Sequence, residues 1–173
     1  MSNLLMASTV WRGSAKPIAM AYRLKLVITS PVAAEVKQAV LSEAASLWPF
    51  IKLPRHGFPS RSGRAGLPRQ DVLADHAHFA ADEAHEGQGH GMDESVAAEL
   101  SQRFPALTFA FVAVECFGGD CEHEGSAWRA GRVFHREVFD DDPSSHRTLL
   151  AHVGITLPDD YFVPFLRGYF GDG

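Results

Sequence analysis

Hydrophobic and polar positions are most regular between residues 106 and 139, where two alternating runs flank a shorter mixed run. From Leu107 to Val114, odd-numbered residues fall on one face of an extended chain and even-numbered residues on the other, and both faces are largely apolar. A strand that is apolar on both faces is typical of the middle of a covered sheet. We therefore predict three consecutive antiparallel strands here, the first of them central.

Two small-residue turns divide this predicted meander. Gly118-Gly119 permits positive φ at both central positions of a two-residue hairpin, and Ala130-Gly131 offers a second turn. The acidic run that ends at Pro143 terminates the third strand. One face of that strand is formed by Val133, His135, Glu137 and Phe139.

The chain before the meander begins with a second alternating run. Residues 22–29 predict a strand with one apolar face. Ser30 and Pro31 then suit the N-cap and the first position of a helix that runs to about Ser46. Residues 48–70 hold four prolines and three glycines, which permit only a short strand at their start and an irregular loop after it.

Two helices are predicted between this loop and the meander. Asp71 is placed to cap a helix through about Ala84, and Asp93 is placed to cap a second helix that Pro105 ends. The stripe of the first is Val72, His76, Phe79 and Glu83, and that of the second is Val96, Ala97, Leu100 and Phe104.

A further helix and an aromatic tail follow the meander. Ser145 is placed to cap the helix, which contains Leu149, Leu150 and Val153, and Gly154 is placed to close it. The tail carries an aromatic stripe, which we interpret as core or, if exposed, as the interface of a homodimer. The stripe consists of Phe162, Phe165, Leu166, Tyr169 and Phe170.

Composition limits the class of protein. The 173 residues favour a single domain, residues 21–173, preceded by a flexible arm at residues 1–20. No run of eighteen apolar residues is present, so no membrane span is expected. The net charge of −5 makes a nucleic-acid partner unlikely. Two cysteines do not make a disulfide scaffold, which indicates a cytoplasmic protein.

Charge is segregated along the chain. Residues 48–70 contain five Lys or Arg and no acid, whereas residues 71–102 contain eight acids and no Lys or Arg. The basic loop either lies against the acidic segment or forms an arm that binds an anionic partner.

The run VAAELSQRFPALTFAFVAVECFGGDCEHEGSAWRAGRVFHREVFDDDP combines a helix ending in Arg-Phe-Pro, an LTF strand, small-residue turns and acidic strand ends. It resembles the YubB ferredoxin-like family, small proteins encoded on bacterial plasmids and phages, over about half the chain. The resemblance implies an α+β fold, a ferredoxin-like antiparallel sheet with helices packed on one face. The family has no agreed activity, and its tryptophan-containing segment before this helix is absent. ECFGGD is also similar to strand-turn segments of bacterial toxin-immunity proteins.

Histidines and cysteines suggest two metal sites. On a helix, His78, Asp82 and His85 share a face, with His90 nearby, a spacing that presents ligands to zinc. A solvated polar helix is the alternative interpretation. Around the Gly-Gly turn, zinc binding, a cross-strand disulfide, a buried thiol and a nucleophilic Cys121 with His123 or His135 as base all remain open. The ligand candidates there are Cys116, Cys121 and His123.

Carboxylates gather at the tip of the first hairpin of the meander. They could perform acid-base chemistry, form a solvated turn or present an acidic face to a basic partner. We favour recognition of a basic protein through this tip and the acidic segment before it. The residues are Glu115, Asp120, Glu122 and Glu124, with Asp82, Glu83 and Glu86.

No P-loop, GxGxxG, GxSxG or kinase motif is present. We therefore expect a non-enzymatic binding module, an inhibitor or immunity-type protein of a mobile element or toxin locus, without a cofactor. A small metal-dependent hydrolase using the cluster between His76 and His90 is the first alternative, with zinc as its cofactor. A dimerising structural module is the second.

Overall fold

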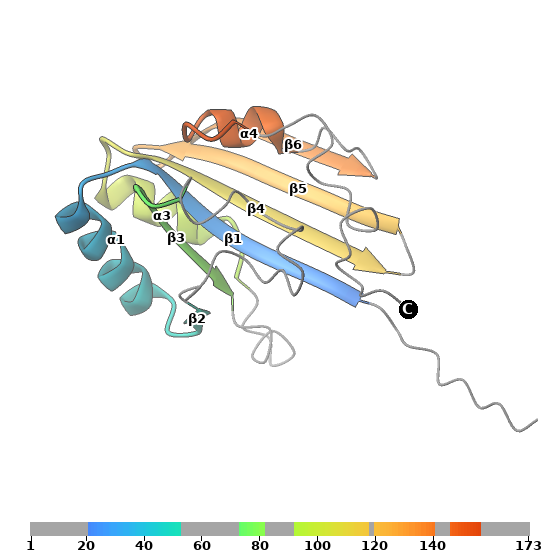
Figure 1. The fold of residues 1–173 in the computed structure, drawn as a ribbon, viewed down its shortest axis with the longest axis horizontal. Helices are drawn as coiled ribbons and strands as arrows, with labels where there is room; N and C mark the ends of the chain where they lie inside the picture. The colour runs from blue at the N-terminus through green and yellow to red at the C-terminus, as the bar shows by residue number, and fades with distance from the viewer. Residues whose placement is uncertain (1–20, 53–72, 82–91, 118–119, 141–145, 157–173) are drawn as a thin grey trace, which may run out of the picture.

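The structure is a computed structural model that describes residues 21–52, 73–81, 92–117, 120–140 and 146–156 (Figure 1). In chain order the elements are β1 (Ala21–Pro31), α1 (Ala34–Leu47), β2 (Ile51–Lys52), β3 (His76–Ala81), α3 (Ser95–Arg103), β4 (Thr108–Phe117), β5 (Asp120–Arg129), β6 (Arg132–Asp140) and α4 (Arg147–Ala151). The arm at residues 1–20, most of the basic loop and the aromatic tail lie outside the described residues.

The strands form one sheet in the order β2-β3-β1-β4-β5-β6, and each neighbouring pair is antiparallel. β1, α1 and β2 form one β-α-β unit, and β3, α3 and β4 form a second. The two units interlock, because β3 lies between the strands of the first and β1 between the strands of the second. This is the ferredoxin-like arrangement, extended by β5 and β6. The predicted α+β, ferredoxin-like fold is confirmed.

Helices α1 and α3 pack together on one face of the sheet (Figure 1). Their amphipathic stripes meet the alternate, apolar side chains of β1, β3 and β4. The core on this face consists of Val27, Val40, Ala44, Ala77, Phe79, Ala81, Met92, Val96, Ala97, Leu100, Phe109 and Phe111.

The short helix α4 and the residues after it cover the opposite face. His76 contributes to this contact, because its Nε2 donates a hydrogen bond of 3.0 Å to the carbonyl oxygen of Val153. The core on this face consists of Leu26, Ile28, Leu73, Ala80, Ala110, Val112, Val114, Ala127, Leu149, Leu150, Val153 and Ile155.

Strand β4 is enclosed as its pattern predicts. It pairs with β1 on one side and β5 on the other. Phe109 and Phe111 are buried under α3, and Val112 and Val114 are buried on the opposite face. The predicted central strand, and the meander that it begins, are confirmed.

The predicted helix from Asp71 is wrong where the structure describes it, because residues 76–81 form β3. This alanine-rich segment is buried on both faces, and it is paired with β1 and β2. The hydroxyl of Thr29 accepts the N–H of Ala77 at 2.9 Å, which adds a side-chain bond to the ladder. Helical spacing of His76 and Phe79 was therefore coincidental, and pairing within the sheet overrides local propensity.

The predicted helix cap at Ser30 and Pro31 is also wrong, because β1 continues through Pro31 and α1 begins at Ala34. The Ser30 hydroxyl instead accepts the N–H of Thr108 at 3.3 Å. The N–H of Val32 donates to the Asp75 carbonyl at 2.7 Å. These hydrogen bonds keep the chain extended at the end of β1, so α1 begins later in the sequence than predicted.

Other local predictions agree with the structure. Ala130 and Gly131 both have positive φ, 49° and 74°, as a tight hairpin turn requires, and Gly154 after α4 has φ 80°. An Asp93 carboxylate oxygen accepts the N–H of Ser95 at 2.9 Å at the start of α3. No helix in the described part of the chain is long and apolar enough to cross a membrane.

We expect Phe109→Ala to lower the free energy of unfolding by about 3–5 kcal/mol, because it opens a cavity between α3 and the sheet. Val138→Ala, at a side chain that is 72% exposed, serves as the control and should change it by less than about 0.5 kcal/mol. Urea denaturation of both variants measures the difference. Equal losses would contradict the assignment of the core.

Candidate functional site

Three of the predicted partner-binding residues form a row on one face of the sheet. Glu115 of β4 is the Cα partner of Glu122 of β5, and Glu124 follows two residues later, opposite Ala113. All three side chains are exposed. They share the face of Phe111, on which α1 and α3 pack, and we call them the acidic row.

The acidic row lies beyond the cover of the described helices α1 and α3. Figure 1 shows β1, β4 and β5 running past α1 and α3 toward the turn that joins β4 and β5. A pocket of about 270 Å³ opens where this cover stops. Its lining includes Lys25, Ala113, Glu124, Arg136 and Val138 and the residues that precede α3.

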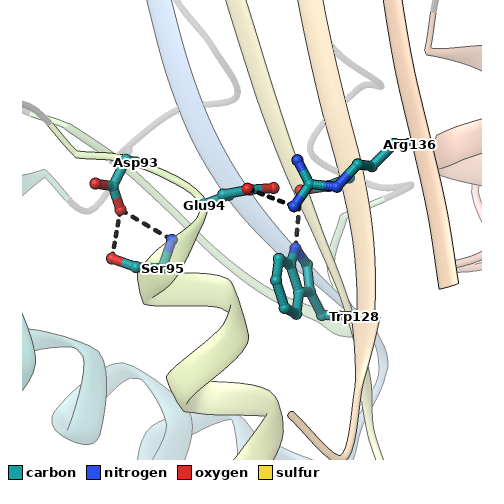
Figure 2. Close-up of polar contacts among 6 residues, drawn as sticks. Asp93, Glu94, Ser95, Trp128 and Arg136 are labelled. Carbon is teal, nitrogen blue, oxygen red and sulfur yellow. Dashed lines mark hydrogen bonds and ion pairs between the residues drawn. The ribbon is translucent and has the colours of Figure 1, made fainter. Parts of the chain in front are cut away.

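Ion pairing fixes the border between the pocket and α3 (Figure 2). The Arg136 guanidinium of β6 donates to the carboxylate of Glu94 at 2.6 Å, and its Cζ lies 5.8 Å from the centre of the Trp128 ring. Trp128 Nε1 in turn donates to the Ser126 hydroxyl at 2.8 Å. The hydroxyl and N–H of Ser95 both donate to Asp93. The start of α3 is thus attached to β6, and none of the described helices covers the sheet past it.

Glu115 lies between Glu122 of β5 and Arg23 of β1 in the ladder, so it has a residue of like charge on one side and a residue of opposite charge on the other. Three other predicted contact residues, Asp82, Glu83 and Glu86, lie outside the described residues, and the side chain of Asp120 is not described either.

The predicted metal ligands are only partly described. His78 lies on β3 and not on a helix, with Nδ1 3.3 Å from the carbonyl oxygen of His76. Burial lowers the pKa of His78, the bond to that carbonyl raises it in part, and Lys37 and His76 lower it further. Asp82, His85 and His90 lie outside the described residues.

At the Gly-Gly turn, Cys116 and Cys121 are Cα partners, but their side chains are not described. His123 is buried, and its ring centre lies 5.3 Å from that of His146. Among the described residues no group of three or more His, Cys, Asp or Glu is arranged to hold a metal ion. The zinc site therefore stays a prediction.

Sequence reasoning missed a buried cluster around Glu137 of β6. One Glu137 oxygen lies 3.0 Å from His146 Nδ1, and the other lies 3.0 Å from His135 Nε2. His146 precedes α4, and both His146 and Glu137 are buried. The alternation of β6 placed His135 and Glu137 on one face, but nothing in the sequence signalled that His146 would join them.

The electrostatics of this cluster favour a charged Glu137. Burial raises the pKa of its carboxyl group, but hydrogen bonds from His146 and His135, together with their positive charge, outweigh burial and leave the pKa below its ordinary value of 4.5. The cluster thus holds an ionised carboxylate between β6 and α4.

Gly125 of β5 makes this approach of α4 possible. A Cβ atom added there would lie 2.3 Å from Leu149 Cδ2 and 3.2 Å from His146 Nδ1. His146 itself has φ 65°, a left-handed conformation that is unfavourable for a non-glycine residue. Close packing of α4 and its bonds to Glu137 outweigh this strain.

Comparison of the chain with protein-family models, with curated proteins and with solved structures found no match.

We expect Gly125→Ala to destabilise the protein by about 1–3 kcal/mol, because the new methyl group overlaps Leu149. Leu149→Ala removes the overlapping atoms, so the double variant should lose less than the sum of the two single variants. A double-mutant cycle by chemical denaturation measures this coupling. Additive losses would show that the contact is absent.

Stability at acid pH should depend on Glu137. Because its folded pKa is depressed, its contribution is complete above about pH 4.5 and disappears as pH falls through the lower folded value. Glu137→Gln should lower the free energy of unfolding at pH 7 by about 1.5–3 kcal/mol and flatten its decline below pH 4.5. Thermal unfolding between pH 3 and pH 7 tests both effects. If the stability of the variant fell below pH 4.5 as steeply as that of the wild type, the role assigned to Glu137 would be contradicted.

Proposed function

We propose that this protein is a non-enzymatic binding protein, and that the acidic row recognises a basic surface on another protein in the manner of an inhibitor. The observation that carries the proposal is the exposure of Glu115, Glu122 and Glu124 together on sheet surface that no described helix covers. A partner's Lys or Arg side chains would pair with these exposed carboxylates.

The surroundings of the acidic row suit a protein interface. Val138 is 72% exposed at the adjacent pocket and provides an apolar contact beside the charged groups. Lys25 and Arg136 line the same pocket and would reject a partner whose basic groups are out of register. Charge complementarity of this kind raises the association rate and sets specificity more than it raises affinity.

The resemblance of residues 96–143 to plasmid- and phage-encoded YubB proteins, and of ECFGGD to toxin-immunity proteins, favours a partner encoded by the same mobile element in a bacterial cytoplasm. A small basic toxin or nuclease has the required surface charge. Binding such a protein requires no cofactor, and the acidic row would act by occupying the partner's own anion-binding surface.

The test is affinity capture with the Glu122→Lys, Glu124→Lys double variant. We expect the wild type to capture a partner with a pI above about 9, with an association rate that falls as salt rises, and the variant to lose capture at least about ten-fold. Glu35→Lys with Asp75→Lys is the matched control, because it changes net charge equally at exposed positions away from the row. Equal loss in both double variants would contradict recognition by the acidic row.

A further inference from the structure

A second pocket lies at the other end of β5, beside the turn that joins β5 to β6. It is an open hollow of about 470 Å³, lined by Arg129, Ala130, Arg132, Phe134 and His152. The lining contains two guanidinium groups, an imidazole and a phenyl ring, and no acid. In a chain of net charge −5, this cationic lining opposes the overall sign of the protein.

A β-bulge places the phenyl ring in this pocket. The register of β5 and β6 shifts between Ala127 and Trp128, which pair with His135 and Val133, so Phe134 is the extra residue. A bulge of this kind redirects a side chain out of the ladder. The Phe134 ring is 49% exposed, and its centre lies 5.1 Å from that of His152, edge to face.

The cationic side of the pocket is preorganised. Arg129 donates from Nε and Nη2 to the Thr108 hydroxyl at 3.0 and 2.6 Å, and its Cζ lies 5.9 Å from the centre of the Phe134 ring. Arg132, in the next strand, is exposed. A guanidinium that is already fixed loses less conformational entropy when it binds an anion.

The His152 ring adds a titratable group to the pocket. Its pKa is lowered by burial first and then by His135, whose ring centre lies 4.9 Å away, with Arg129 lowering it further and Glu137 opposing them. The imidazole is therefore mostly neutral near pH 7. An anion in the pocket would favour its protonated form, so anion binding and proton uptake would be coupled.

We propose that this pocket binds a small organic anion that carries a planar ring, of the nucleoside monophosphate class, with the ring against Phe134 and the anionic group between Arg129 and Arg132. The pocket volume is within the range of small-molecule sites. Stacking on an aromatic ring and contacts from arginine are the interactions that such a ligand offers. The acidic row lies on the other face of the sheet, so this inference does not depend on the proposed function.

The test is titration of the full chain with AMP, with adenosine and inorganic phosphate as controls for the ring alone and the charge alone. We expect AMP to bind with a Kd of about 0.01–1 mM and each control at least about ten-fold more weakly. NMR titration of the His152 ring should show a pKa that rises when AMP is bound, and AMP affinity should increase from pH 8 to pH 7, a range in which the phosphate, with a second pKa of about 6, stays mainly dianionic. Phosphate binding as tight as AMP, or an unchanged His152 pKa, would overturn the proposal.

Two variants locate the site. Arg132→Ala and Phe134→Ala should each weaken AMP binding about ten-fold or more, whereas Arg136→Ala, which removes the same charge on the opposite face, should leave it unchanged. Melting temperatures confirm that each variant is folded. Equal effects of all three variants would overturn the assignment of the site. Binding of a single-stranded pentanucleotide ten-fold tighter than AMP would also overturn the proposal, because the ligand would then be a polymer.

Discussion

The antiparallel pairing of β1 with β4 is the interaction on which the rest of the structure depends. It runs without a register shift from Ala21 opposite Phe117 to Thr29 opposite Phe109, and it joins the two interlocked β-α-β units. Leu26 and Val112, partners in this ladder, are both fully buried. Because successive residues point to opposite faces, one ladder supplies apolar side chains to both cores at once.

That double supply requires cover on both faces of the sheet. α1 and α3 protect one face, and α4 protects the other through Leu149 and Leu150. On the face under α1 and α3, glutamates lie near the turn that joins β4 and β5, and on the face under α4, arginines and a phenyl ring lie near the turn that joins β5 and β6. Glu122 and Arg129 are seven residues apart along β5, about 23 Å. The molecule therefore presents two chemically opposite surfaces on one rigid sheet.

Sequence patterns predicted the elements that neighbouring residues determine, and missed those that depend on contacts between residues far apart in the chain. The alternation of Leu107 to Val114 was sufficient to predict β4 as a central strand, because a strand that is apolar on both faces is stable only where both faces are covered. His76 to Ala81 was misassigned because an alanine-rich run of six residues satisfies either period, and only its partners in β1 and β2 select the strand. The exposure of Glu122 and Glu124 followed from the hairpin. The burial of Glu137 did not, since it depends on Gly125 admitting His146 of a separate element.

The cover that α4 provides has a consequence for how the chain reaches this structure during translation. The ferredoxin-like elements end with β4, yet Leu26, Ile28, Ala110 and Val112 lack their contacts with Leu149 and Leu150 until α4 is made. A nascent chain that has emerged only through β4 would carry this hydrophobic sheet face without the cover that α4 provides. Completion of the fold must therefore wait for the ribosome to release α4, and in that interval the exposed face is a natural target for chaperones.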